Sequence, residues 1–557
     1  MRIIKATACY GKSYFLAVVI LYVHLVSSPQ NASALASSTS SEAEALLKWK
    51  TSFPIRTHNN LTSWTYTPSN STGPKPKGCP FHHWTGVSCN NAGSVNRINL
   101  TNSGIQGTLH EFPFLSLPNL EYVDVSFNRL FDVIPLQIGS LPKLIYLDLS
   151  SNQLSGRIPP EIGRLKNLSV LHLFLNQLNG SIPQEIGQLK FLSDLALYNN
   201  SLEGPIPDSL GNISKQLGLY PNLQFIDLSH NKLYGEISPR WGQCSKLQTL
   251  RIAGNKLTGS IPPEIGNATQ IQRLDLSSNG LVVVIPNEIG KMTSLLNLML
   301  NDNQLSGGVP LEFGAFTDLL SLDLSTNKFN MSIPSILGDL LQLTFLNLSN
   351  SKFCQEILFQ LGNLVHLSQL DLSHNSLEGR IPQLSKLQSL EKLNLSHNNL
   401  SGLIPNFDPM NALDFIDMSY NQLQGPVPNN KAFQHALLEG NKGLCGTVRG
   451  LQPCFISTVG NKHSSTKERK LMLLIISLIL GVLLPASLGI VLIRRGRRKR
   501  QETEHGDMQN EVFSISDFDG KRMYEKILKA TIVLMPAIAS EKEDPEVSTR
   551  QSCYQEA

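Results

Sequence analysis

Hydrophobic residues return along this chain in a fixed frame, L-x-x-L-x-L-x-x-N-x-L. The frame occurs fourteen times, for long stretches every 24 residues. In the copy at 144–154 the leucines are expected to point inward, whereas Tyr146, Asp148 and Ser150 alternate with them and face outward. This alternation is the period of a short β-strand. One such strand cannot bury its apolar side alone, so the copies are predicted to stack on one another.

One slot of the frame is asparagine in twelve of the fourteen copies, with Ser103 and Ser351 as the exceptions. The slot lies where the chain turns off the strand, so its amide is expected to satisfy backbone polar groups exposed there. Serine offers fewer hydrogen-bonding groups, so those two turns are predicted to be weaker. A fixed period of this length indicates a leucine-rich-repeat solenoid with a long open concave face, which favours binding of an extended partner.

The period breaks once, between Asn200 and Asn231, where the two slots lie 31 residues apart. Two copies of the same motif start, Leu210-Gly211 and Leu217-Gly218, stand seven residues apart there. The break is either a junction at which whole repeats are missing relative to a longer protein or a tolerated insertion in a surface loop.

The segments outside the repeats predict secretion and one membrane crossing. The chain starts with basic residues followed by an apolar run, which is typical of a signal peptide. A second apolar stretch of 23 uncharged residues is long enough for a hydrocarbon core of ~30 Å, and the basic run after it is typical of a cytoplasmic flank. The expected order is signal peptide 1–36, N-terminal cap 37–97, about fourteen repeats 98–440, C-terminal cap and outer juxtamembrane segment 441–470, transmembrane helix 471–493 and cytoplasmic tail 494–557.

The cysteines agree with an oxidising compartment. Cys244 and Cys354 lie five repeats apart, about 24 Å at the ~4.8 Å spacing of stacked strands, which is beyond disulfide reach. Both are therefore predicted to be free thiols. Two local disulfides are predicted, one at each end of the repeats: Cys79 with Cys89, and Cys445 with Cys454.

Glycosylation sequons also favour an extracellular location, because all thirteen precede the second apolar stretch. The net charge of +4 comes partly from the basic run after that stretch, so nucleic acid is not expected as a partner. No cofactor or metal is expected. The predicted glycosylation sites are Asn31, Asn60, Asn70, Asn99, Asn167, Asn179, Asn199, Asn212, Asn267, Asn330, Asn347, Asn394 and Asn399.

Several segments resemble plant leucine-rich-repeat receptor-like kinases, similar to those of the MDIS1-interacting type. "WTGVSC" (84–89) resembles their N-terminal cap, "GNKGLCG" (440–446) their C-terminal cap, and "FSISDFDGKRMYEKILKAT" (513–531) the segment that leads into their kinase domain. The resemblance implies an α/β solenoid: a plant-type leucine-rich-repeat superhelix with disulfide caps, a single transmembrane helix and a short cytoplasmic tail. It also implies a second short strand at L-x-G-x-I-P and a short helical turn at "EIGRL" (161–165).

The resemblance ends at about Thr531. No G-x-G-x-x-G, V-A-I-K, H-R-D or D-F-G motif follows the second apolar stretch, so the chain is not expected to be an enzyme. The first hypothesis is a single-pass type I plasma-membrane receptor that binds a secreted peptide or protein and signals through a co-receptor kinase. The alternative is a truncated form of a serine/threonine receptor kinase whose full-length product phosphorylates. An extracellular inhibitor similar to polygalacturonase-inhibiting proteins is disfavoured by the stretch at 471–493.

Departures from the repeat consensus predict where a ligand binds. The central outward strand position is most often Asp, which is interpreted as scaffold, whereas clustered aromatic residues on adjacent strands form an apolar patch. Two arginines could clamp a carboxylate, although Arg251 lies level with Asp227 and Asp275 and could pair with them instead. The candidate ligand-binding residues are Tyr146, His172, Phe174, Leu175, Tyr198, Phe225, Arg251, Arg273, Met299 and Asn301.

Three sequons narrow this prediction. Asn99, Asn347 and Asn394 occupy the central outward position, where a glycan would block the concave face. Ligand contacts are therefore expected between repeats two and eight.

Overall fold

The computed structural model describes residues 30–65, 81, 83–207, 209, 222–408, 410–448 and 450–454, with the backbone alone at 30–40 and 59. The predicted membrane span and cytoplasmic tail lie outside these residues, as does the predicted signal peptide up to residue 29. Within the described residues no helix is both long and apolar enough to cross a membrane.

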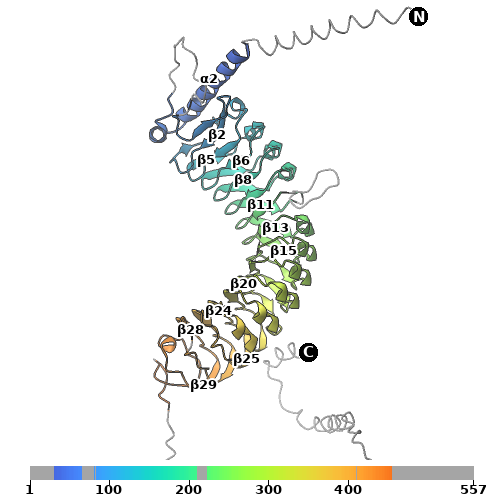
Figure 1. Ribbon diagram of the computed structural model, residues 1–557, viewed down its shortest axis with the longest axis vertical. Coiled ribbons are helices and arrows are strands. Elements are labelled where there is room, and N and C mark those ends of the chain that lie inside the picture. Colours follow the sequence, from blue (N-terminus) through green and yellow to red (C-terminus); the bar gives the residue numbers. More distant parts are fainter. Residues whose placement is uncertain are drawn as a thin grey trace, which may run out of the picture. The chain divides into compact units, whose positions relative to one another are not determined.

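The repeats form one 15-stranded sheet (Figure 1). β1 and β2 are antiparallel, and the following strands continue in parallel, one for each repeat of the frame. We call the outward side of this sheet the strand face. The strands are β1 (Val87–Cys89), β2 (Val95–Asn99), β4 (Tyr122–Asp124), β6 (Tyr146–Asp148), β8 (Val170–His172), β10 (Asp194–Ala196), β12 (Phe225–Asp227), β14 (Thr249–Arg251), β16 (Arg273–Asp275), β18 (Asn297–Met299), β20 (Ser321–Asp323), β22 (Phe345–Asn347), β24 (Gln369–Asp371), β26 (Lys392–Asn394) and β28 (Phe415–Asp417).

A second short strand follows in each repeat, as the resemblance implied, and these strands form sheets of seven, three and five. The seven are β3 (Gln106–Gly107), β5 (Arg129–Val133), β7 (Gln153–Arg157), β9 (Gln177–Gly180), β11 (Ser201–Pro205), β13 (Lys232–Glu236) and β15 (Lys256–Thr258). The three are β17 (Val282–Val283), β19 (Gln304–Gly307) and β21 (Lys328–Phe329). The five are β23 (Cys354–Glu356), β25 (Ser376–Arg380), β27 (Asn399–Gly402), β29 (Gln422–Pro426) and β30 (Gly443–Cys445).

The implied helical turns are 3₁₀-helices. A proline stands just before or at the first residue of most of them, where its fixed φ suits the start of a helix. They are η2 (Phe114–Ser116), η3 (Leu136–Ser140), η4 (Pro160–Arg164), η5 (Gln184–Gln188), η7 (Pro239–Gln243), η8 (Pro263–Asn267), η9 (Asn287–Lys291), η10 (Leu311–Ala315), η11 (Ser335–Asp339), η12 (Phe359–Asn363) and η13 (Lys431–Phe433).

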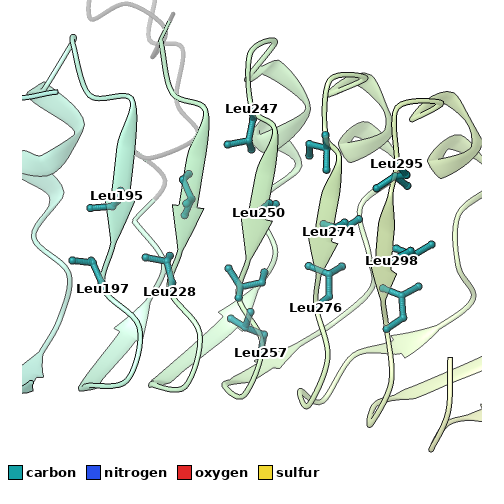
Figure 2. Close-up of a cluster of buried hydrophobic side chains, with 14 of the residues drawn as sticks. Leu195, Leu197, Leu228, Leu247, Leu250, Leu257, Leu274, Leu276, Leu295 and Leu298 are labelled. Atoms are coloured by element: carbon teal, nitrogen blue, oxygen red, sulfur yellow. The ribbon is translucent and has the colours of Figure 1, made fainter. Parts of the chain in front are cut away.

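The inward leucines form a continuous interior, as predicted. Leucines of successive repeats, such as Leu250, Leu274 and Leu298, pair in register and lie side by side (Figure 2). Each is fully buried, which contributes roughly 1.5–3 kcal/mol per side chain. On the outward side, Asp148 and Ser150 are nevertheless covered by neighbouring side chains and are only 7% and 0% exposed. The Asp148 carboxylate accepts hydrogen bonds from the Ser150 amide and hydroxyl, so the pair is satisfied without water.

The asparagine slot works as a bracket between neighbouring repeats. The Asn152 amide donates to the carbonyls of Val125, Leu149 and Ser150 at 3.0–3.1 Å, and its Oδ1 accepts from the Leu130 amide at 2.9 Å. Four polar groups of two repeats are thereby paired by one side chain. In place of this set, the Ser351 hydroxyl accepts a hydrogen bond from the backbone amide of Asn327 at 3.3 Å.

The interrupted period does not interrupt the sheet. β10 pairs with β12 in the ordinary register, Leu195 opposite Ile226, and β11 pairs with β13. Both ladders are therefore continuous across the break, which agrees with a surface-loop insertion and equally with a junction at which whole repeats are missing.

The N-terminal cap is built on α2 (Gln30–Thr51), followed by α3 (Ile55–His58) and η1 (Asn59–Leu61). Glu42 of α2 is buried, and its carboxylate accepts hydrogen bonds from the Ser94 hydroxyl and the Val95 amide at the edge of the sheet. Trp49 and Trp64 are fully buried, with their ring centroids 6.4 Å apart. The cap thus shields the first repeat, as a solenoid end requires.

The cysteines differ from the prediction at one position. Cys244 is free and buried. Cys354 is disulfide-bonded, so the predicted free thiol there is wrong; the distance argument had excluded only Cys244 as its partner. Cys89, Cys445 and Cys454 are also disulfide-bonded, and Cys79 lies outside the described residues.

Candidate functional site

A continuous row of rings crosses the strand face between β4 and β10. Tyr122 stacks on Tyr146 with ring centroids 4.3 Å apart, and Phe174 stacks on Tyr198 at 4.5 Å. His172 joins the two pairs, 6.0 Å from Tyr146 and 5.8 Å from Phe174. We call these five residues the aromatic row. Four of its members were predicted from the sequence as ligand-binding residues: Tyr146, His172, Phe174 and Tyr198.

The strand register explains the path of this row. Tyr122 and Tyr146 face each other at the first strand position, whereas His172 holds the third position beside Asp148. Phe174 and Tyr198 follow two residues after β8 and β10, so they take the next outward position. Parallel strands lie ~4.8 Å apart, which is close to the spacing at which aromatic rings stack.

His172 lies between two carboxylates. Its Nδ1 is 3.2 Å from Asp148 Oδ2, and its Nε2 is 3.2 Å from Asp194 Oδ1. Burial lowers the pKa of His172, but the hydrogen bonds and charges of the two aspartates outweigh burial and raise it to about 9. The imidazole is therefore charged at neutral pH and lies between two acidic side chains.

Two of the three tyrosines of the row are held by buried aspartates. The Tyr146 hydroxyl donates to Asp148 Oδ2 at 3.3 Å, and Tyr122 makes the same bond to Asp124. Burial and the nearby carboxylate raise the pKa of Tyr146 far above its ordinary value, so its phenol stays neutral. At the N-terminal end of the row, the guanidinium carbon of Arg97 lies 3.6 Å from the centroid of the Tyr122 ring, a cation–π contact.

Arg251 is engaged within the sheet rather than free to clamp a ligand. Its Nη1 lies 3.4 Å from Asp227 Oδ2 and its Nε 3.8 Å from Asp275 Oδ2. Arg251 thus forms the predicted lateral ion pair. Of the two arginines suggested to bind a ligand carboxylate, Arg251 is therefore already paired with aspartates. Arg273 is exposed at the first position of the next strand and forms no ion pair within the described chain.

The remaining candidates are not members of the aromatic row. Leu175 occupies the turn after β8 with a φ of 52° and is 45% exposed. Phe225 follows Asp194 in register on β12, and Met299 follows Asp275 on β18. Asn301 lies two residues after β18, where its backbone carbonyl accepts a hydrogen bond from Asn303.

The three sequon asparagines at the central outward strand position have hydrogen-bond partners within the chain. The Asn347 amide donates to Asp323 at 3.5 Å and the Asn394 amide to Asp371 at 3.3 Å. Asn99 Oδ1 accepts from the amide and hydroxyl of Thr101. All three side chains are half-buried. Asn60, Asn167, Asn179, Asn199 and Asn267 are exposed, Asn330 and Asn399 half-buried, and the side chains of Asn31, Asn70 and Asn212 are not among those described.

A second aromatic stack was missed by sequence reasoning. His374, His397 and Tyr420 stack in turn, with centroids 4.1 and 4.4 Å apart. Each stands just before the asparagine slot with a φ of 52–53°. The signal was present in the sequence, because three successive copies carry an aromatic ring at the position just before the asparagine slot. Sequence reasoning also missed Tyr122, Arg97 and Asp194. The contacts of these residues are with neighbouring strands, which a comparison within one repeat does not contain.

Comparison with known proteins shows which protein families this chain resembles. The family profile described as "Leucine rich repeat N-terminal domain" matches residues 39–90, and "Leucine rich repeat" profiles match 143–165, 222–244, 246–268, 270–292 and 365–423. The matched segments are thus leucine-rich repeats, in agreement with the predicted fold class of the repeats.

The relatives are more particular. One is a probable leucine-rich repeat receptor-like protein kinase of Arabidopsis thaliana, 44% identical over 22% of this chain and 10% of its own length. Another is MDIS1-interacting receptor like kinase 2 of the same plant, 41% identical over 23% of this chain and 11% of its own. The matches confirm the resemblance to plant leucine-rich-repeat receptor-like kinases, although they span only about a tenth of those relatives' length.

Among solved structures, a plant peptide hormone receptor, RGFR1 in complex with RGF2, is 32% identical. The similarity covers 61% of this chain and 57% of the receptor chain, with a TM-score of 0.54.

Proposed function

We propose that the solenoid is the extracellular part of a single-pass plasma-membrane receptor that binds a secreted peptide or protein on its strand face. The observation that carries the proposal is the aromatic row, because five rings in contact across four strands form a continuous aromatic strip on the strand face. Similarity to a receptor that binds a peptide hormone supports an extended peptide as the ligand.

The aromatic rings suit binding for a physical reason. Phe174 and Tyr198 are half-buried, so each keeps an exposed edge while its stacking partner fixes the ring. A fixed aromatic side chain loses little conformational entropy when a ligand covers it, which is why such residues dominate binding energies.

Signalling is proposed to pass through a partner. A ligand that bridges the strand face to a co-receptor ectodomain would bring the kinase of that partner to the membrane, as the family resemblance implies. The test is ligand-dependent co-precipitation of the full-length chain with a candidate co-receptor. If an active ligand never recruits a second kinase, the chain instead sequesters ligand.

A double variant tests the binding site. Phe174→Ala with Tyr198→Ala should cost at least ~2 kcal/mol of binding free energy, measured by calorimetry. The matched control is His397→Ala with Tyr420→Ala, which removes another stacked pair of the same sheet and should leave ligand affinity unchanged. Unchanged affinity in the first variant, with normal secretion, would move the site elsewhere.

A further inference from the structure

Asp194 occupies an unusual place on the strand face. The first strand positions, followed in register from β2 to β28, carry aromatic, aliphatic, polar and basic residues, and Asp194 is the one acidic residue among these described strands. Its neighbours in that row are Val170 on one side and Phe225 on the other, with Tyr146 one strand further. A carboxylate therefore stands in an apolar and aromatic setting.

This carboxylate is more accessible than the others that surround it. The Asp194 side chain is 34% exposed, whereas Asp148 on the far side of His172 is 10% exposed and Asp227 is 5% exposed. Asp148 and Asp227 also accept hydrogen bonds from the serine two residues later. Asp194 Oδ1 is buried beside His172, so a ligand would reach the Asp194 carboxylate from its other side.

The charges around Asp194 favour a cation over an anion. From β4 to β16 the strands carry Asp124, Asp148, Asp194, Asp227 and Asp275 against His172, Arg251 and Arg273. His172 and Arg251 each already lie between two of these carboxylates. An anionic ligand group near Asp194 would therefore meet a net negative surface whose nearest cations are paired.

The chain itself shows how a basic side chain sits on this row. Arg97 stands on β2 in register with Tyr122 of β4, and its guanidinium lies on the Tyr122 ring. A ligand side chain that lies along Val170 between Tyr146 and Phe225 would bury its aliphatic part and place its charged end at Asp194.

We propose that the ligand presents a lysine or arginine side chain to Asp194, between Tyr146 and Phe225 on the strand face. The inference rests on the proposed function, since it names the chemistry that the same face selects in a peptide. The basic side chain would be a specificity determinant, because His172 contacts only Oδ1 of the carboxylate, and a peptide without a basic group would cover the other oxygen without giving it a donor.

The experiment selects peptides from a displayed random 12-residue library on the purified full-length chain. The wild-type chain should enrich peptides with Lys or Arg at one fixed position beside apolar residues. Peptides so selected should bind Asp194→Asn at least about tenfold more weakly, the loss of one charge-assisted pair. Selection on Asp194→Lys should enrich Asp or Glu at the same position instead.

The control is Asp302→Asn, an exposed acidic residue beside the same face at a φ of 55°, which asparagine tolerates. It should keep the wild-type preference. Enriched peptides without a conserved basic position, or with equal affinity for Asp194→Asn, would overturn this inference and leave the proposed function standing. No enrichment at all on the folded wild-type chain would overturn both.

Discussion

Ser351 offers a direct test of what the asparagine slot contributes. In the next repeat Asn375 accepts a hydrogen bond from the Phe353 amide at 3.0 Å and donates to three carbonyls at 2.9–3.1 Å. Ser351→Asn should build the equivalent set, with the Phe329 amide as the new donor to Oδ1. We expect the variant to stabilise this turn.

The magnitude follows from the number of bonds gained. A net hydrogen bond contributes about 0.5–1.5 kcal/mol. The carbonyls of Leu324 and Leu348 already accept from Asn327 and Asn375, so much of the gain comes from the Phe329 amide. The expected stabilisation is about 1–2 kcal/mol. The reverse change, Asn375→Ser, removes most of four bonds and should cost about 2–4 kcal/mol.

Hydrogen exchange measures this effect locally, because each repeat of a solenoid contacts only its neighbours. In Ser351→Asn, amides of 324–334 and 346–353 should exchange roughly five- to thirtyfold more slowly. In Asn375→Ser, amides of 348–356 and 370–378 should exchange faster. Unchanged exchange in both variants would mean that water serves these groups as well as the asparagine does, and would refute the bracket.

Three further predictions concern charge, backbone strain and the cap. Because Asp148 and Asp194 raise the pKa of His172 to about 9 from 6.5, its stabilising contribution should be complete below about pH 6.5 and lost as the pH rises through about 9. The loss should be about 1–2 kcal/mol after allowance for partial exposure, seen in urea unfolding of the wild type and absent in His172→Gln. Val283 is a β-branched residue at a φ of 71°, so Val283→Gly should raise the stability by up to about 1 kcal/mol in thermal unfolding, and a lowered stability would contradict the strain. Glu42→Ala should cost about 1–3 kcal/mol and speed amide exchange at the first strand of the repeats, because it leaves two buried donors unpaired.

The ladder could be predicted because its period is rigid. A fixed spacing between slots places Leu250, Leu274 and Leu298 opposite one another whatever stands between them, so burial and register follow directly. The bracket of Asn152 follows from the same geometry, since the turn leaves polar groups that must be paired. Sequence reasoning succeeds here because each repeat imposes the same solution on the next.

The aromatic row could be predicted only in part. Tyr146, His172 and Phe174 were found because each departs from the consensus within its own repeat. Their union into one row depends on ring orientation across strands, which a linear pattern does not contain. The disulfide bond of Cys354 was missed for a similar reason. Repeat spacing predicts only whether two cysteines within the repeats are close enough to form a disulfide.

The bracket formed by Asn152 has a consequence for how such a chain changes over generations. The hydrogen bonds of its side chain reach its own repeat and the one before it. A duplicated or deleted copy therefore finds, on either side, the surroundings that its parent copy had. Unequal recombination can lengthen or shorten the gene by whole units without a compensating mutation, so the length of the recognition surface can be inherited as a count of copies while its specificity drifts copy by copy.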